Sequence, residues 1–139
     1  MGYAIERYHD ISVGHRVVGH EGKCRNLHGH NYRVRFTVGS AILDEVGRVL
    51  DFSVVKTALC QWLEDHWDHR FLVWGDDPLR EHLTNLDETV VVVPFNPTAE
   101  NVAQYLVEVV GPQQLRGTGV VLQAVVVEET RKCRAAFFR

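Results

Sequence analysis

The sequence predicts an α+β fold, in which an antiparallel sheet carries two helices on one face. Strand-like alternation lies near both ends of the chain, two segments with helical spacing lie in the middle, and no repeat or low-complexity segment divides them. The chain has 139 residues, 45% of them hydrophobic, which is enough for one domain with a core. We therefore expect a single domain over residues 1–139.

The first half of the chain predicts two strands and a helix. Apolar residues alternate over 11–17 and again over 32–38, where arginines and a threonine fill the other face. The spacing then changes to that of one helix face up to about residue 66, and Ser53 is a reasonable N-cap for this helix.

The second half predicts a short strand, a helix and two further strands. The strand over 89–93 stops at Pro94, and the helix begins at Pro97–Thr98 and ends at Gly111–Pro112. One face of this helix would carry Val102, Leu106 and Val109. Strands are expected over 119–129 and 135–138. A short chain with this many strands has few ways to cover its sheet edges, so we expect a homo-oligomer.

Composition excludes several classes of protein. Fifteen Lys and Arg against 18 Asp and Glu give a net charge of −3, which argues against a general nucleic-acid binder. No apolar run reaches the roughly 20 residues of a membrane helix. The three scattered cysteines favour reduced thiols and a cytoplasmic location, with Cys60 and Cys133 expected to be buried and structural.

Histidines give the first indication of chemistry, because five of the eight fall within residues 9–30. His28 and His30 are two residues apart, so on a strand both imidazoles point to the same side. A hairpin would bring His15 beside them, and three neutral imidazoles with an open fourth position are typical of catalytic zinc. The alternative is a set of exposed or hydrogen-bonded hairpin histidines.

Cys24 lies between Lys23 and Arg25 in a polar loop. Neighbouring cations favour the thiolate, which is the form that acts as base or nucleophile. This pattern favours a reactive cysteine over a buried structural one.

Two further groups could carry acid–base or binding chemistry. Asp68–His69 would form a histidine oriented by a carboxylate, but Asp65–His66 is equally possible on spacing, and a solvated helix end explains both. Glu129 would end an apolar wall, where its carboxylate could accept paired N–H groups from a flat heterocycle. An exposed strand end is the alternative. The wall is expected to consist of Val121, Val125 and Val127.

The motifs together resemble one enzyme family. The run Cys24-x-x-x-His28-Gly29-His30-Asn31-Tyr32, with His15 upstream, resembles the 6-pyruvoyl-tetrahydropterin synthase and 6-carboxytetrahydropterin synthase family. Further matches follow in order, from about residue 11 to residue 130: Leu50-Asp51-Phe52, Asp68-His69-Arg70, Pro97-Thr98-Ala99-Glu100-Asn101 and Glu129-Thr130. Two departures are Ile11-Ser12-Val13-Gly14-His15 and Val73-Trp74, which replace more usual residues.

This resemblance implies the tunnelling fold, whose subunits close a barrel by oligomerising, usually as a hexamer. It also implies Zn²⁺ as cofactor and a pterin triphosphate as substrate, with no nucleic-acid or membrane partner. The implied metal ligands are His15, His28 and His30. The implied catalytic groups are the Cys24 thiolate, Asp68, His69 and Glu129, of which Glu129 also anchors the pterin. Thr98 and Glu100 match positions that line the pterin pocket near a subunit boundary.

The three residues between Cys24 and His28 resemble the 6-carboxytetrahydropterin synthase branch. That branch is a lyase that converts 7,8-dihydroneopterin triphosphate to 6-carboxy-5,6,7,8-tetrahydropterin in 7-deazaguanine (queuosine) synthesis, releasing acetaldehyde and triphosphate. Two alternatives stay open. One is the pyruvoyl reaction on the same substrate, and the other is a non-catalytic, zinc-stabilised assembly module.

Overall fold

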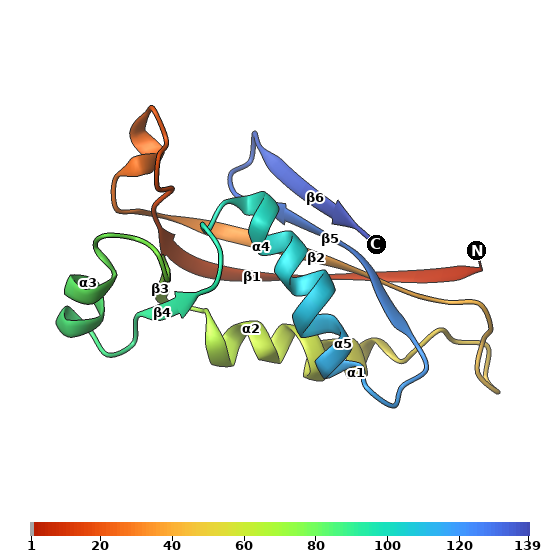
Figure 1. The fold of residues 1–139 in the computed structure, drawn as a ribbon. Helices are drawn as coiled ribbons and strands as arrows, with labels where there is room; N and C mark the ends of the chain where they lie inside the picture. The colour runs from red at the N-terminus through yellow and green to blue at the C-terminus, as the bar shows by residue number, and fades with distance from the viewer. Residues whose placement is uncertain (1) are drawn as a thin grey trace.

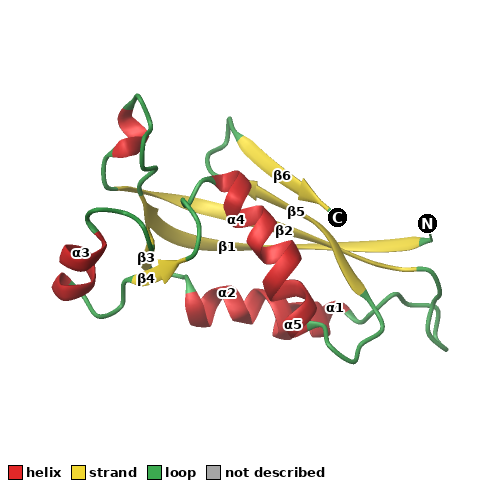
Figure 2. Ribbon diagram, viewed as in Figure 1, coloured by secondary structure: helices red, strands yellow, loops and turns green. Residues whose placement is uncertain are grey.

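The computed structural model describes residues 2–139 as a curved six-stranded sheet with helices on one face (Figures 1 and 2). The strands are β1 (Tyr3–His15), β2 (His28–Ser40), β3 (Arg70–Trp74), β4 (Val91–Val93), β5 (Val121–Glu128) and β6 (Arg134–Phe138). Their order in the sheet is β4-β3-β1-β2-β5-β6. The predicted α+β class is confirmed.

Two long helical segments lie on the same face of the sheet. The first comprises α1 (Phe52–Val55), a π-helical turn (Lys56–Cys60) and α2 (Gln61–His66). The second comprises α4 (Ala99–Tyr105), a π-helical turn (Leu106–Val110) and α5 (Gly111–Gln114). A shorter helix, α3 (Arg80–Leu86), lies between β3 and β4, and one 3₁₀ turn, η1 (Lys23–Arg25), lies between β1 and β2.

The sheet is antiparallel through β1, β2, β5 and β6, as the sequence predicts for its main part. At the other edge, β3 runs parallel to β1, and β4 runs parallel to β3. The parallel strands were not predicted as such. The first long helical segment crosses the sheet face and brings the chain to β1, where β3 begins, and α3 then connects β3 to β4; parallel pairs require connections of this kind.

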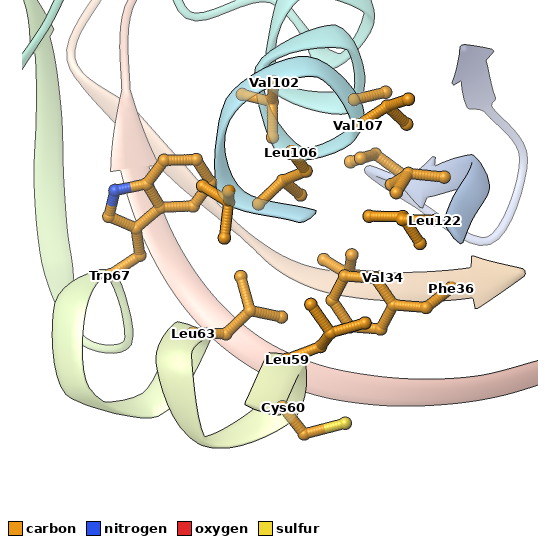
Figure 3. Close-up of a cluster of buried hydrophobic side chains, with 14 of the residues drawn as sticks. Val34, Phe36, Leu59, Cys60, Leu63, Trp67, Val102, Leu106, Val107 and Leu122 are labelled. Carbon is orange, nitrogen blue, oxygen red and sulfur yellow. The ribbon is translucent and has the colours of Figure 1, made fainter. Parts of the chain in front are cut away.

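The core lies between the sheet and both helical segments (Figure 3). The apolar residues of the predicted alternation in β2 form its helix-facing side, as expected. All four are at most 1% exposed: Tyr32, Val34, Phe36 and Val38. The helices contribute Leu59, Leu63, Val102, Leu106 and Val107 to the same cluster. This face of β2 also carries the histidines, so its burial sets the direction in which they point.

The helix boundaries differ from those predicted. Asp51, not Ser53, is the N-cap of α1, because the Asp51 carboxylate accepts a hydrogen bond from the Ser53 N–H at 2.8 Å. Gly111–Pro112 does not end the second helical segment, which continues to Gln114. A Cβ at Gly111 would lie 2.7 Å from Leu122 Cδ2, so glycine allows the helix to approach β5. Val110, rather than Val109, is the buried residue of the last turn.

A register shift between Thr37 and Val38 in the β2–β5 pairing changes which side chains of β5 face the core. Val125 and Val127 are fully buried as predicted, but the wall continues through Leu122 because Val121 is 42% exposed. Cys60 is buried as predicted, whereas Cys133 is exposed in the β5–β6 turn, which contradicts the expectation for it.

Candidate functional site

The register between β1 and β2 places three histidines together on the helix-facing side. In this antiparallel pair His15 lies opposite His28, and Val13, two residues earlier in β1, lies opposite His30, two residues later in β2. The candidate ligand atoms of the three imidazoles lie within 4.8 Å of one another. The hairpin thus brings His15 beside the His28–His30 pair, as predicted.

Each imidazole directs an unpartnered nitrogen into this cluster. The Nε2 atoms of His15, His28 and His30 are buried without a hydrogen-bond partner. His15 Nδ1 lies 2.6 Å from the Pro97 carbonyl oxygen, and His28 Nδ1 lies 2.7 Å from that of Asn26. Because a carbonyl only accepts, Nδ1 carries the proton in both rings and Nε2 keeps its lone pair. These two lone pairs converge with the unpartnered Nε2 of His30, an arrangement that fits a divalent cation such as zinc.

Burial also favours the neutral rings that a metal requires. Burial lowers the pKa of His15 to about 4, against the raising effect of the Pro97 carbonyl. Burial likewise lowers the pKa of His30, although the Glu129 carboxylate acts in the opposite direction. These two imidazoles are therefore neutral and able to bind a metal at neutral pH.

The segment before α4 fixes the carbonyl that orients His15. Thr98 is the N-cap of α4, and its hydroxyl accepts a hydrogen bond from the Asn101 N–H at 3.1 Å. The Asn101 amide donates to the Asn96 carbonyl at 2.9 Å, so the turn around Pro97 is closed on both sides. Glu100 is exposed in the first turn of α4. A local structural role thus accounts for Thr98, and pterin contact by Thr98 and Glu100 stays a prediction.

Cys24 lies on η1, between the two strands that carry the histidines. Its carbonyl accepts a hydrogen bond from the Val17 N–H at 2.8 Å, which holds the turn close to the end of β1. Val17 lies two residues after His15, so this hydrogen bond places the Cys24 turn beside the end of β1 that carries His15. Cys24 is therefore in the neighbourhood of the histidine cluster.

Tyr32 belongs to the quoted motif, but sequence reasoning assigned it no role. Its hydroxyl lies 3.1 Å from His15 Nδ1, and its ring stacks on that of His30 with centroids 5.9 Å apart. Its position two residues after His30 was the available signal. Tyr32 therefore contacts the rings of both His15 and His30.

Glu129 follows β5 and reaches the same cluster. Its Oε1 atom lies 3.3 Å from His30 Nε2, and its backbone N–H donates to the Cys133 carbonyl at 3.1 Å. A carboxylate therefore stands at the edge of the candidate metal centre.

Asp68 and His69 form a pair that is anchored to β1. Asp68 accepts hydrogen bonds from the Ser12 N–H at 2.9 Å and from His69 Nδ1 at 2.9 Å. Partial burial would raise the pKa of Asp68, but the Ser12 and His69 hydrogen bonds outweigh it and lower the pKa. The His69 backbone has a φ of 58°, which is costly outside glycine and typical of constrained functional residues.

The alternative pair, Asp65–His66, is engaged elsewhere. His66 Nδ1 lies 2.8 Å from the Trp62 carbonyl, and Asp65 accepts a hydrogen bond from the Gln61 amide at 2.9 Å. The geometry of a histidine held by a carboxylate therefore belongs to Asp68–His69.

The Asp68–His69 pair opens on a different side of the sheet from the histidine cluster. The His69 side chain is 78% exposed and lines a hollow on the face that the helices leave bare. Ser12, Gly14, Gly29 and Asn31 line that hollow and alternate along β1 and β2 with the residues of the helix-facing side, two of which, Val13 and His30, also contribute to its lining. One chain thus gathers the three histidines, Cys24 and Glu129, and presents His69 separately.

Within residues 2–139, no helix has both the length and the apolar character needed to span a bilayer.

Comparisons with known proteins agree with this geometry. The family model described as 6-pyruvoyl tetrahydropterin synthase matches residues 4–139. The 6-carboxy-5,6,7,8-tetrahydropterin synthase of Rickettsia typhi is 30% identical over 126 residues, covering 89% of this chain and 91% of the relative. The enzyme of the same name from Aquifex aeolicus is 36% identical over 111 residues, covering 76% of this chain and 67% of the relative.

Solved structures show the same fold. An uncharacterised protein from Wolinella succinogenes superposes with a TM-score of 0.87 at 27% identity, covering 99% of this chain and 98% of that one. The 6-pyruvoyl tetrahydropterin synthase of Caenorhabditis elegans gives 0.71 at 25% identity, covering 99% and 95%. The expected tunnelling fold is confirmed. The match over nearly the whole chain shows that it belongs to the 6-pyruvoyl tetrahydropterin synthase family.

Proposed function

We propose that this chain is a 6-carboxy-5,6,7,8-tetrahydropterin synthase, a lyase that converts 7,8-dihydroneopterin triphosphate and water to 6-carboxy-5,6,7,8-tetrahydropterin, acetaldehyde and triphosphate. The observation that carries the proposal is the convergence of three unpartnered Nε2 atoms beside a carboxylate, next to the turn that carries Cys24. The names of the relatives and the three-residue spacing between Cys24 and His28 favour the carboxy product. The product would supply 7-deazaguanine (queuosine) synthesis.

His15, His28 and His30 would hold the metal through their Nε2 atoms. When bound there, zinc supplies Lewis-acid chemistry, which makes a bound hydroxyl easier to deprotonate.

The other residues of the site would divide binding and proton transfer between them. Cys24 acts as the base that takes a proton from the substrate side chain. Glu129 accepts the paired N–H groups of the pterin edge and holds the ring in place, which reduces the entropic part of the barrier. His69, held by Asp68, returns or removes a proton on the opposite side of the substrate.

His69 would reach the substrate from a neighbouring copy of the chain. β1 pairs with β3 only through Val13 and Gly14. Among residues 2–139 of a single copy, the rest of that edge of β1 is therefore unpaired, as is the outer edge of β6. Joining such edges extends the sheet from copy to copy and removes them. We therefore propose a homo-oligomer, a hexamer on the family resemblance, in which one copy contributes His69 to the metal centre of another.

The three cysteines of the chain form no disulfide, and a reducing compartment suits them, so we propose a cytoplasmic location.

A second candidate is the pyruvoyl reaction on the same substrate, favoured by the description of the family model and by the Caenorhabditis elegans neighbour. It eliminates triphosphate and keeps the two-carbon fragment. The same residues would serve both reactions, so the product must decide.

The test is to incubate the zinc-loaded protein with dihydroneopterin triphosphate, identify the pterin by mass spectrometry and assay acetaldehyde separately. Carboxytetrahydropterin with acetaldehyde supports the proposal, and pyruvoyl-tetrahydropterin without acetaldehyde supports the second candidate. Cys24→Ala tests the role of the Cys24 thiolate in this assay. Cys133→Ser is its matched control, because Cys133 is an exposed cysteine in another turn. Stoichiometric zinc without turnover would indicate a zinc-stabilised module instead.

A further inference from the structure

The connection that carries Cys24 has little structure of its own. It runs over residues 16–27, contains only the single turn η1, and lies largely outside the core. Side-chain hydrogen bonds from Asn96 and His28 attach it to the rest of the domain, and one from Arg16 holds it together internally. The Asn96 amide pairs with the Val18 N–H and carbonyl at 3.0 and 2.9 Å, and Arg16 Nη1 donates to the Arg25 carbonyl at 3.2 Å.

Arg16 is itself held by a buried carboxylate. Arg16 Nε and Nη2 donate to the two oxygens of Asp77, each at 2.7 Å. The Asp77 side chain is 1% exposed and that of Arg16 is 18% exposed. Bidentate pairing fixes the plane of a guanidinium as well as its position, so the third nitrogen, Nη1, is aimed at the Arg25 carbonyl.

Asp77 is fixed in turn by the connection between β3 and α3. Asp77 Oδ1 accepts a hydrogen bond from the Leu79 N–H at 2.8 Å, and the Asp77 carbonyl accepts one from the Arg80 N–H at 2.9 Å. A carboxylate that its own turn already orients offers Arg16 a rigid partner. Asp77, 61 residues after Arg16 in the sequence, thereby joins the β3–α3 connection to the Cys24 turn.

We propose that Arg16 and Asp77 are positioning residues that hold the Cys24 turn in its productive place through the Arg25 carbonyl. Neither side chain needs to touch substrate. This inference rests on the proposed function for its kinetic readout, while its structural readout is independent of any activity. Because Cys24 moves a proton and does not bind the pterin, loosening its turn reduces kcat and leaves KM nearly unchanged.

The main variant is Asp77→Asn, which keeps the shape of the side chain but places an amide nitrogen against a guanidinium N–H. Arg16→Lys is the second variant, because it keeps the positive charge and loses the fork. Asp10→Asn is the matched control. Asp10 makes the same bidentate pair with Arg33, at 2.9 and 3.0 Å, but in an exposed position away from the turn.

Two measurements are made on the zinc-loaded protein: amide hydrogen exchange and steady-state kinetics. Amide hydrogen exchange of residues 16–27 includes the Val17 and Asn26 N–H groups, which bond within the turn. We expect their protection to fall by about tenfold or more in Asp77→Asn and Arg16→Lys, with the β2–β5 ladder unchanged. We expect kcat to fall by about 10- to 100-fold, KM to change by less than about twofold, and Asp10→Asn to match the wild type.

The double variant Arg16→Lys/Asp77→Asn separates a coupled pair from two independent effects. A pair that acts as one unit gives a double variant no slower than the slower single variant, whereas independent effects multiply. Unchanged protection of the turn, an unchanged kcat despite a loosened turn, or multiplied effects would each overturn the proposal. If the wild type itself shows no turnover, the proposed function fails, and hydrogen exchange alone decides whether the pair holds the turn. If Asp77→Asn does not fold, Arg16→Lys provides both measurements.

Discussion

The metal-free protein is expected to lose stability on mild acidification because of one buried histidine. His15 is 1% exposed, and burial lowers its pKa from 6.5 to about 4. As the pH falls below about 6.5, the unfolded chain takes up a proton at this position and the folded chain does not. The free energy of unfolding therefore declines between about pH 6.5 and pH 4, and this contribution stays constant below that range.

The size of the effect follows from the two pKa values. A group with a pKa of 6.5 unfolded and about 4 folded costs about 2 kcal/mol at about pH 5, and about 3 kcal/mol once the pH is well below 4. A loss of about 2 kcal/mol is a large fraction of the stability of an ordinary domain.

The assay is urea unfolding of the EDTA-treated protein at about pH 7.5 and pH 5, for the wild type, His15→Gln and His66→Gln. The amide of His15→Gln can still donate to the Pro97 carbonyl but does not titrate, so its stability should fall by about 2 kcal/mol less than that of the wild type. His66 also bonds to a backbone carbonyl but is exposed, so His66→Gln should follow the wild type. Equal losses in the wild type and His15→Gln would show that His15 is not the buried neutral group described above.

Three further substitutions test the site and the packing behind it. Cys24→Ala should lose turnover and keep its zinc, since none of the three clustered nitrogens belongs to Cys24, and near-normal activity would contradict the thiolate role. Asp68→Asn should lower kcat by about 10- to 100-fold at unchanged zinc content, because the carboxylate that orients His69 is lost; an unchanged kcat would remove the pair from the mechanism. Gly111→Ala should lower the unfolding free energy by about 1–3 kcal/mol, because the new methyl would lie 2.7 Å from Leu122 Cδ2. Helix propensity alone would raise the Tm of this variant. A raised Tm would therefore show that Leu122 shifts to make room for the new methyl group.

Much of the fold could be predicted from patterns that are local in sequence. The alternation of β2 and the helical spacing after residue 52 follow directly from which side chains are buried. The first part of β1 was missed because its helix-facing residues include Arg7 and His9, which hide the period. β3 was missed because five residues after a helix carry too little pattern to distinguish a strand. The register shift opposite Thr37 depends on how two strands pair, which no single strand displays.

The same difference between local patterns and long-range pairing decides which parts of the candidate site could be predicted. The histidine cluster could be predicted because His28 and His30 lie on one strand, and a hairpin brings His15 to them. The side of the sheet on which the His69 side chain lies could not be predicted, because it depends on where β3 joins β1. The link between Arg16 and Asp77 joins two connections that no short motif relates.

The proposed metal ligands, His15, His28 and His30, and the proposed catalytic groups differ in what holds them in place. A slip of one residue between β1 and β2 would turn His28 and His30 to the bare face, and the same slip would expose Val34 and Phe36. The burial that stabilises β2 therefore also fixes the metal ligands, and the domain cannot lose one without the other. The Cys24 turn and the Asp68–His69 pair are attached to this sheet by a few polar contacts instead. Substitutions in those contacts should therefore reduce catalysis well before they reduce metal binding, whereas substitutions in the core of β2 should affect both together.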